Sequence, residues 1–188
     1  MPYPSIRHYH QAVLLTPQQI ASYGVQTLGM TYTDSNNLIM LVNGAGLPAR
    51  VLIPMIADRI GPLNMILLGV TSVGITILSW LAVDSIPGLY VFTAFLGITS
   101  GATQSLMPTT IASITRRLDT VGTRLGMCFS IISVASLTGP PIGGALQGAD
   151  GGDWKGAQAW AGVSALVGAM FLLASRTFKV GWTLKANC

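Results

Sequence analysis

Five runs of about 20 predominantly apolar residues follow one another along the chain, and they leave little choice of fold. They cover residues 37–57, 64–83, 88–107, 125–146 and 157–174. A helix of about 20 residues matches the hydrocarbon thickness of a bilayer, and only helices and closed barrels satisfy every backbone group in lipid. The runs therefore predict an all-α, polytopic membrane protein with about five transmembrane helices.

The composition supports a lipid environment. Only 9% of the residues are charged and 51% are hydrophobic, whereas globular domains carry roughly 25% charged residues. The 22 glycines suit membrane helices that pack closely through small residues. We therefore expect the bilayer to be the main partner of this chain.

The segments between the runs are polar and rich in helix breakers. They contain DRIGPL, DSIP, residues 108–124 and QGADGGDWK, and Gly, Pro and charges gather in such connectors. We expect a polar, external N-terminal segment over 1–36, a membrane domain over 37–174 and a cytoplasmic tail over 175–188. The first thirty residues contain no apolar stretch longer than AVLL, too short for a signal peptide.

The basic residues predict the orientation. Seven Lys and Arg lie in the connections after the first, third and fifth runs and two lie on the opposite side, and cytoplasmic loops are the basic ones. The seven are Arg59, Arg116, Arg117, Arg124, Arg176, Lys179 and Lys185, and the two are Arg7 and Lys155. The C-terminus is thus expected to be cytoplasmic, with the plasma membrane as the expected location.

Five spans then place the N-terminus on the external side, which is an awkward start without a signal peptide. We therefore expect a piece whose preceding helices are missing, through truncation, a wrong gene start or a partner chain.

Several other classes of function lack the residues they need. The basic residues form no stripe with interleaved aromatics, which argues against nucleic acid as a partner. His8 and His10 have no third ligand near them, and Cys128 and Cys188 have no metal spacing, so we expect no metal site. No nucleophile with a nearby base and no phosphate-binding loop is visible, so we expect no cofactor and no enzyme.

An arginine stands inside the first run, which continues into the connector as LVNGAGLPARVLIPMIADRIG. Arg50 lies about 5 Å from the expected midplane at 1.5 Å per residue, where insertion of an arginine costs roughly 2.5 to 3.5 kcal/mol. We expect Arg50 to face a wet cavity and to bind a carboxylate substrate through two hydrogen bonds. The alternative is a structural arginine that bonds helix-end carbonyls or extends toward the interface. Asn43, on roughly the same face, is a second candidate, with an interhelical hydrogen bond as its alternative.

Two stretches resemble a known family. LVNGAGLPARVLIPMIADRIGPLN resembles the eighth helix and following loop of fungal monocarboxylate-carrier-like transporters of the major facilitator superfamily, and SLTGPPIGGAL resembles their eleventh helix. The matching residues of the first stretch are Asn43, Ala49, Arg50, Asp58, Arg59, Gly61 and Asn64.

The resemblance covers about residues 21–175 and implies a partial major-facilitator fold in which the five runs are helices eight to twelve. IASYGVQTLGMTYTDSNN would then be the external loop that enters helix eight. Animal relatives carry an acidic residue four positions before the arginine, where this chain has Gly46, so proton coupling through such a pair is not expected here.

The resemblance also implies roles for residues near the ends of the first run and within the fourth. Asp58, Arg59 and Gly61 would form a cytoplasmic gate, although a simple solvated turn explains the same residues. Gly139, Pro140, Pro141 and Gly143 break the fourth run, since proline lacks an amide donor, and would serve as a hinge or a packing feature. Ser133, Ser136 and Thr138 are the residues expected to satisfy the freed carbonyls.

Two pairs of glycines have the G-x-x-x-G spacing, Gly97 with Gly101 and Gly144 with Gly148. We expect them to mark close helix contacts and not a site.

The function implied is a secondary transporter, or part of one, that moves a small organic anion or metabolite by alternating access. The direction is either proton-linked uptake or export, including export of a fungal secondary metabolite. The alternative is a non-transporting membrane remnant or interaction protein that associates with a full-length relative.

Overall fold

The computed structural model describes residues 19–115, 117–149 and 151–180 of the chain, and these residues are helical apart from short connections. The helices are α2 (Tyr32–Ile60), α3 (Pro62–Ser79), α4 (Ile86–Ser113), α5 (Val121–Ala149) and α6 (Lys155–Val180), with short 3-10 turns η1 (Trp80–Ala82) and η2 (Leu118–Thr120). Five helices are long and apolar enough to cross a bilayer. The predicted all-α, polytopic fold class is therefore confirmed.

The helices extend beyond the apolar runs. α2 begins at Tyr32, because Thr31 caps it by accepting a 3.2 Å hydrogen bond from the amide of Asp34. At the other end of the chain, α6 continues to Val180. Part of each expected flanking segment is therefore helical, whereas 1–18 and 181–188 lie outside the described residues.

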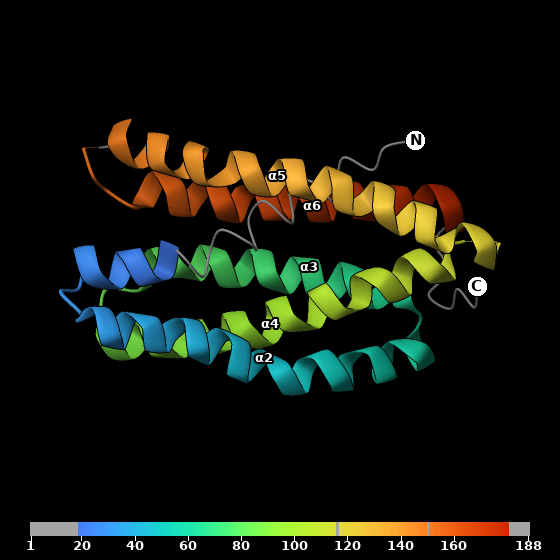
Figure 1. Cartoon of the computed structure of the whole chain (residues 1–188), viewed down its shortest axis with the longest axis horizontal. Coiled ribbons are helices and arrows are strands. Elements are labelled where there is room, and N and C mark those ends of the chain that lie inside the picture. The colour runs from blue at the N-terminus through green and yellow to red at the C-terminus, as the bar shows by residue number, and fades with distance from the viewer. Residues whose placement is uncertain (1–18, 116, 150, 181–188) are drawn as a thin grey trace.

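The five long helices lie roughly side by side, as Figure 1 shows. α2, α3 and α4 form one group, and α5 and α6 form a second layer along one side of that group. α4 packs against both α2 and α3, and α3 also packs against α6. Half of the most apolar window of α4 is buried, compared with 17% for α2 and for α5. α4 is therefore the central helix, and the outer faces of α2 and α5 are exposed.

α2 and α4 approach each other through glycines. A Cβ added to Gly46 would lie 2.8 Å from the carbonyl oxygen of Gly97, and one added to Gly101 would lie 2.9 Å from the carbonyl oxygen of Gly46. The prediction that Gly97 and Gly101 mark a close helix contact is confirmed. For Gly144 and Gly148 it is wrong, because nothing among the described residues lies within 4 Å of a Cβ built on either.

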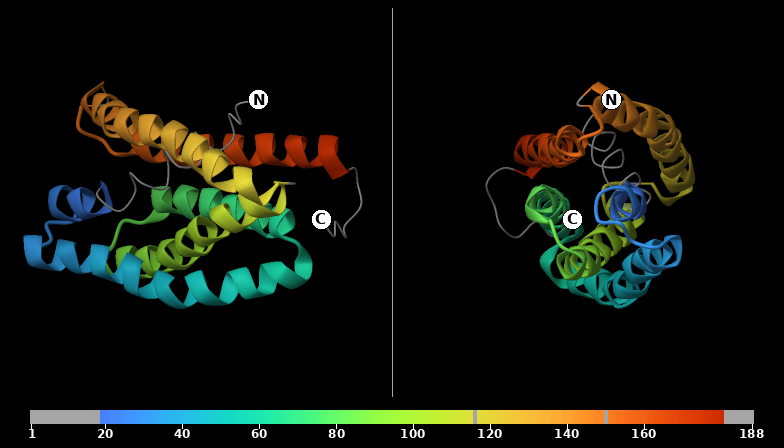
Figure 2. Two further views of the ribbon diagram at one scale, coloured as in Figure 1. Left: turned by 45° about the vertical axis from the view of Figure 1, so that its right-hand side comes forward. Right: turned by 90° about the vertical axis from the view of Figure 1, so that its left-hand side faces the viewer.

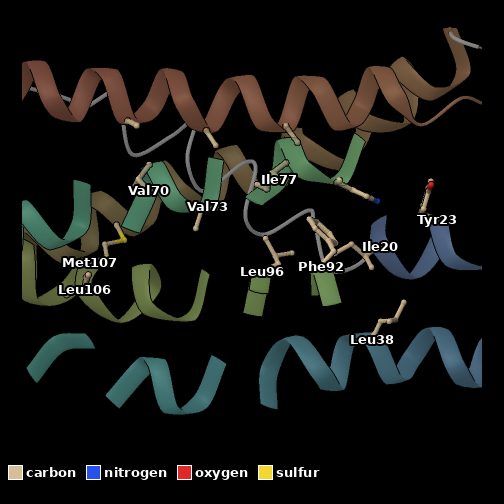
Figure 3. Close-up of a cluster of buried hydrophobic side chains, with 14 of the residues drawn as sticks. Ile20, Tyr23, Leu38, Val70, Val73, Ile77, Phe92, Leu96, Leu106 and Met107 are labelled. Carbon is tan, nitrogen blue, oxygen red and sulfur yellow. The ribbon is translucent and has the colours of Figure 1, made fainter. Parts of the chain in front are cut away.

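The apolar core runs along α3 and α4 and reaches α2 and the segment before it. Figure 3 shows Val70, Val73 and Ile77 of α3 above Leu96, Leu106 and Met107 of α4. Near one end of the bundle, Ile20 and Leu38 join the same cluster.

Residues 19–26 do not form the external loop expected from the sequence. They are helical, and Ile20 and Tyr23 are buried in the core at 0% and 5% exposure. In the end-on view of Figure 2 this short helix, drawn in blue, lies beside α2 within the bundle. The segment is therefore part of the packed structure, where it lies against α2, α4 and the α3–α4 connection.

Four buried aromatic residues gather where residues 19–26, the end of α3, the start of α4 and the α5–α6 connection meet. We call this the aromatic end of the bundle. The ring of Tyr23 contacts Trp80 and Trp154 edge-on at centroid distances of 5.6 and 5.9 Å, and Trp80 stacks on Phe92. The hydroxyl of Tyr23 donates a 2.8 Å hydrogen bond to the carbonyl of Val83. The cluster therefore joins residues 19–26 to the α3–α4 connection and to the α5–α6 connection.

Tyr23→Phe should lower stability at neutral pH by about 1 kcal/mol, the usual value of one hydrogen bond. Burial raises the pKa of the Tyr23 hydroxyl above its ordinary value, and the carboxylates of Asp84 and Asp153 raise it further. The stability that the protonated Tyr23 hydroxyl gives to the folded state is therefore fully present below about pH 10, and it is lost as the pH rises through the folded-state pKa.

The measurement is the thermal unfolding midpoint of wild type and Tyr23→Phe at pH 8 and pH 11, with Tyr32→Phe as control because Tyr32 is 79% exposed. The Tyr23 variant should lose less stability than wild type between the two pH values. An equal loss in all three proteins would contradict a role for the Tyr23 hydroxyl.

Candidate functional site

Arg50 lies on the flank of α2 and not on the face that packs against α4. Ala49, beside it, is 7% exposed, whereas Val51 on its other side is 64% exposed, and Arg50 itself is intermediate. Arg50 thus lies at the edge of the α2–α4 contact. An arginine at this depth needs a polar partner or water, because lipid offers it neither.

No acidic side chain of α2 is close enough to neutralise Arg50. Asp58 is eight residues further along the helix, about 12 Å at 1.5 Å per residue. Asp34 is twice as far in the other direction. The ion pairs among the described residues are Arg117 with Asp119 and Lys155 with Asp153, so no ion pair between described residues includes Arg50.

Asn43 shares the flank of Arg50, since seven residues return to the same side of a helix within about 20°. Its side-chain amide donates a 3.0 Å hydrogen bond to the carbonyl of Ile39 on the same helix, and Asn43 is exposed. Among the described residues this bond lies within one helix, and the interhelical hydrogen bond offered as an alternative is not seen. Asn43 stands about 10 Å from Arg50 along the axis, with its amide oriented by its own helix.

Two prolines of α2 bracket Arg50, and the sequence reasoning did not single them out. Pro48 and Pro54 lie inside the continuous helix. Each lacks the amide that would bond to the carbonyl four residues earlier, which leaves the carbonyls of Gly44 and of Arg50 itself without that partner. Pro54 lies on the same flank as Arg50, so the backbone on this side of α2 has a carbonyl that lacks its helical donor. The signal was present in LPARVLIP as a Pro spacing of six residues.

The gate candidates Asp58, Arg59 and Gly61 lie at the end of the bundle opposite the aromatic residues, which we call the arginine end. Gly61 has φ 104° and its amide bonds to the carbonyl of Ala57 at 2.8 Å, and this left-handed region favours glycine. Pro62 then starts α3. Asp58 and Arg59 are exposed and form no ion pair with a described residue. The tight turn at Gly61 is therefore present, while the gating role stays a prediction.

The expected break in the fourth run is absent, because α5 continues as one helix through Pro140 and Pro141. Both prolines are exposed, and Gly139 and Gly143 are buried. Each proline lacks an amide N–H, so the backbone carbonyl four residues before it has no helical donor. Thr138 does not reach these two carbonyls, since its hydroxyl bonds to the carbonyls of Val134 and Ala135.

Ser133 also bonds elsewhere, to the carbonyl of Ser130 at 2.8 Å. The expectation that Ser133 and Thr138 repair the helix at the prolines is therefore wrong, and no described hydrogen bond assigns this task to Ser136. The region is a continuous helix that lacks two backbone hydrogen bonds, and its role as a hinge stays a prediction.

The three groups of candidates occupy different parts of the bundle. Arg50 and Asn43 lie along α2, the Asp58 group lies at the arginine end, and the glycine and proline group lies in α5 toward the aromatic end. No hydrogen bond or ion pair between described residues joins one group to another. The arrangement is one polar flank on α2, with one further group of candidates toward each end of the bundle.

Residues 12–186 match the sequence model described as Major Facilitator Superfamily. An "MFS-type transporter" of Gibberella zeae is 40% identical over 167 residues, covering 88% of this chain and 38% of the relative. "MFS-type transporter pynF" of Aspergillus niger is 35% identical over 157 residues, covering 84% of this chain and 36% of the relative. "MFS-type transporter opdF" of Penicillium oxalicum is 36% identical over 157 residues, covering 83% of this chain and 37% of the relative.

The chain thus spans less than two fifths of the length of these three relatives. No solved structure gives a significant match.

Proposed function

We propose, on the premise that this chain belongs to the major facilitator superfamily, that it forms part of a secondary transporter that moves a small organic anion across a membrane. The observation that carries this proposal is Arg50, a half-buried cation on an apolar helix, with no acidic partner among the described residues. A planar guanidinium in such a place favours a carboxylate, which it holds through two parallel hydrogen bonds.

The transport mechanism proposed is alternating access around a site near the bilayer midplane. Arg50 and Asn43 would face the passage, Asp58, Arg59 and Gly61 would act at the cytoplasmic gate, and the Gly139–Gly143 region would flex. The positions of these groups along the bundle, one near the middle and the others toward the two ends, suit this assignment. Proton coupling through a carboxylate one turn before Arg50 is not part of it, because that position is Gly46.

We also propose that the five long helices correspond to helices eight to twelve of a carrier of the monocarboxylate-carrier-like group, with a cytoplasmic C-terminus in the plasma membrane. Support comes from Arg59, Arg117 and Arg124 at the arginine end and Lys155 at the aromatic end, since cytoplasmic connections are the more basic ones. Export of a fungal metabolite and proton-linked uptake are both directions that such a carrier allows, and the matched relatives are named MFS-type transporters of fungi.

The second candidate is a membrane protein that does not transport and that associates with a full-length relative. Translation of the genomic DNA upstream of Met1 separates the two candidates: seven further apolar spans in frame support the transporter, and a mature transcript that begins at Met1 supports the second candidate.

Transport itself is tested in proteoliposomes that contain the protein encoded by the whole transcript. We expect saturable uptake of a radiolabelled monocarboxylate that is inhibited by other organic anions and not by organic cations, because Arg50 selects for negative charge. Uptake equal to that of protein-free liposomes across a panel of organic anions would contradict the proposal.

A further inference from the structure

α5 is held loosely against the rest of the bundle. Only 17% of its most apolar window is buried, compared with 44% for α6. Its buried residues, Ile132, Ala135, Gly139 and Gly143, are three or four positions apart and so form a single narrow stripe. The position of the last turns of α5, at the aromatic end of the bundle, therefore depends on the contacts made at the Gly143 end of this stripe.

Those contacts come from residues 19–26 and are polar. The side-chain amide of Gln147 donates a 3.1 Å hydrogen bond to the side-chain carbonyl of Gln26. The end of the Gln19 side chain occupies the space that a Cβ on Gly143 would need. The glycine thus makes room for a glutamine from a segment more than 100 residues away in sequence.

On its other side, the same segment is fixed by stronger contacts. Tyr23 bonds to the carbonyl of Val83 and packs its ring on Trp80 and Trp154. The hydroxyl of Ser35 on α2 donates to the carbonyl of Ala21, and Ile20 is fully buried. The segment therefore has firm contacts with α2, with α4 and with the α3–α4 and α5–α6 connections, and a light polar attachment to α5 itself.

The backbone of α5 is weakest just before the residues that the segment touches. Pro140 and Pro141 remove two consecutive helical hydrogen bonds immediately before Ile142 and Gly143. Residues beyond this point are connected to the first part of α5 by fewer backbone bonds than a regular helix has. Sharp bends in helices occur at such positions.

We propose that residues 142–149 form a hinged end of α5, and that residues 19–26 act as a strap that holds this end closed through Gln19 and Gln26. Opening separates Gln147 from Gln26 and Gly143 from Gln19, while Tyr23 and its aromatic partners keep the strap in place. The hinge is a property of this bundle alone and does not depend on whether the chain transports a substrate.

The test is hydrogen exchange of the 188-residue chain in lipid nanodiscs, followed by mass spectrometry of fragments of α5. Gln147→Ala and Gln26→Ala should each raise the exchange rate of amides in 142–149 by about threefold to tenfold, as expected for one lost hydrogen bond. Exchange in 121–135 should stay unchanged. The double variant should exchange no faster than either single variant, because both remove the same contact.

A matched pair of glycines provides the control. Gly143→Ala places a methyl group against Gln19, whereas Gly144→Ala meets nothing within 4 Å, and both substitutions change helix propensity equally. Gly143→Ala should turn the end of the Gln19 side chain away from α5 and thereby raise exchange in 142–149, and Gly144→Ala should leave it unchanged or slow it.

Equal exchange in the Gly143→Ala and Gly144→Ala proteins, together with no effect of Gln147→Ala, would overturn the strap. A rise spread over the whole of 121–149 would also overturn it, because a hinge confines opening to one side of the prolines.

Discussion

Gly97→Ala should destabilise the bundle by about 1 to 3 kcal/mol, although alanine is the better helix former. A Cβ at this position would collide with the carbonyl of Val42 on α2. Backbone atoms face each other here, so no side chain can rotate to relieve the collision. α2 must move away from α4, which also separates Gly46 from Gly101.

Gly44→Ala is the matched control for this substitution. Gly44 lies on the same helix as Val42, two positions further along, and nothing lies within 4 Å of its added Cβ. The control should therefore stabilise the protein by up to about 1 kcal/mol, through helix propensity alone. Opposite signs in a denaturation series carried out in mixed micelles would confirm the close approach of α2 and α4, and equal shifts would contradict it.

Arg50→Ala should reduce transport of an organic anion by the protein from the whole transcript at least 100-fold, the equivalent of about 3 kcal/mol for a lost charged hydrogen-bond pair. Insertion should become easier, since removing a central arginine removes a cost of roughly 2.5 to 3.5 kcal/mol. The amount of protein in the membrane should therefore stay equal or rise while transport falls.

Arg50→Lys and Arg117→Ala complete the experiment. Lysine keeps the charge but lacks the planar fork, so it should restore only a small part of transport. Arg117 is exposed and pairs with Asp119, and its removal should leave transport near wild type. Full transport by the Arg50→Ala protein, at equal surface expression, would reduce Arg50 to a structural residue.

The candidate site could be predicted from the sequence only as far as the chemistry of single residues extends. An arginine in an apolar run and a glycine after DRI are informative because lipid and a left-handed turn each admit few residue types. The contacts of Asn43, Ser133 and Thr138 were not predictable in this way. Each hydroxyl or amide has several carbonyls within reach, and the backbone geometry selects among them.

The two G-x-x-x-G pairs show the same limit. Both have small residues one turn apart, yet only Gly97 and Gly101 have a helix against them among the described residues. Residues 19–26 present a related case, since a short stretch of mixed polarity reads equally well as a loop or as a helix. In the structure it is a helix, and its Tyr23 packs on Trp80 and Trp154, which are distant in sequence.

The sequence by itself determined the solvent of this protein, the number of its candidate spans and the lack of an acidic residue one turn before Arg50, because hydrophobic length and charge are local properties of the chain. Only the tertiary structure decided which faces meet: that α4 is central, that α2 contacts it through glycine, and that residues 19–26 hold the end of α5. Periodicity states which side of a helix is apolar, but the choice of neighbour depends on how well two surfaces fit, and that is a property of the pair.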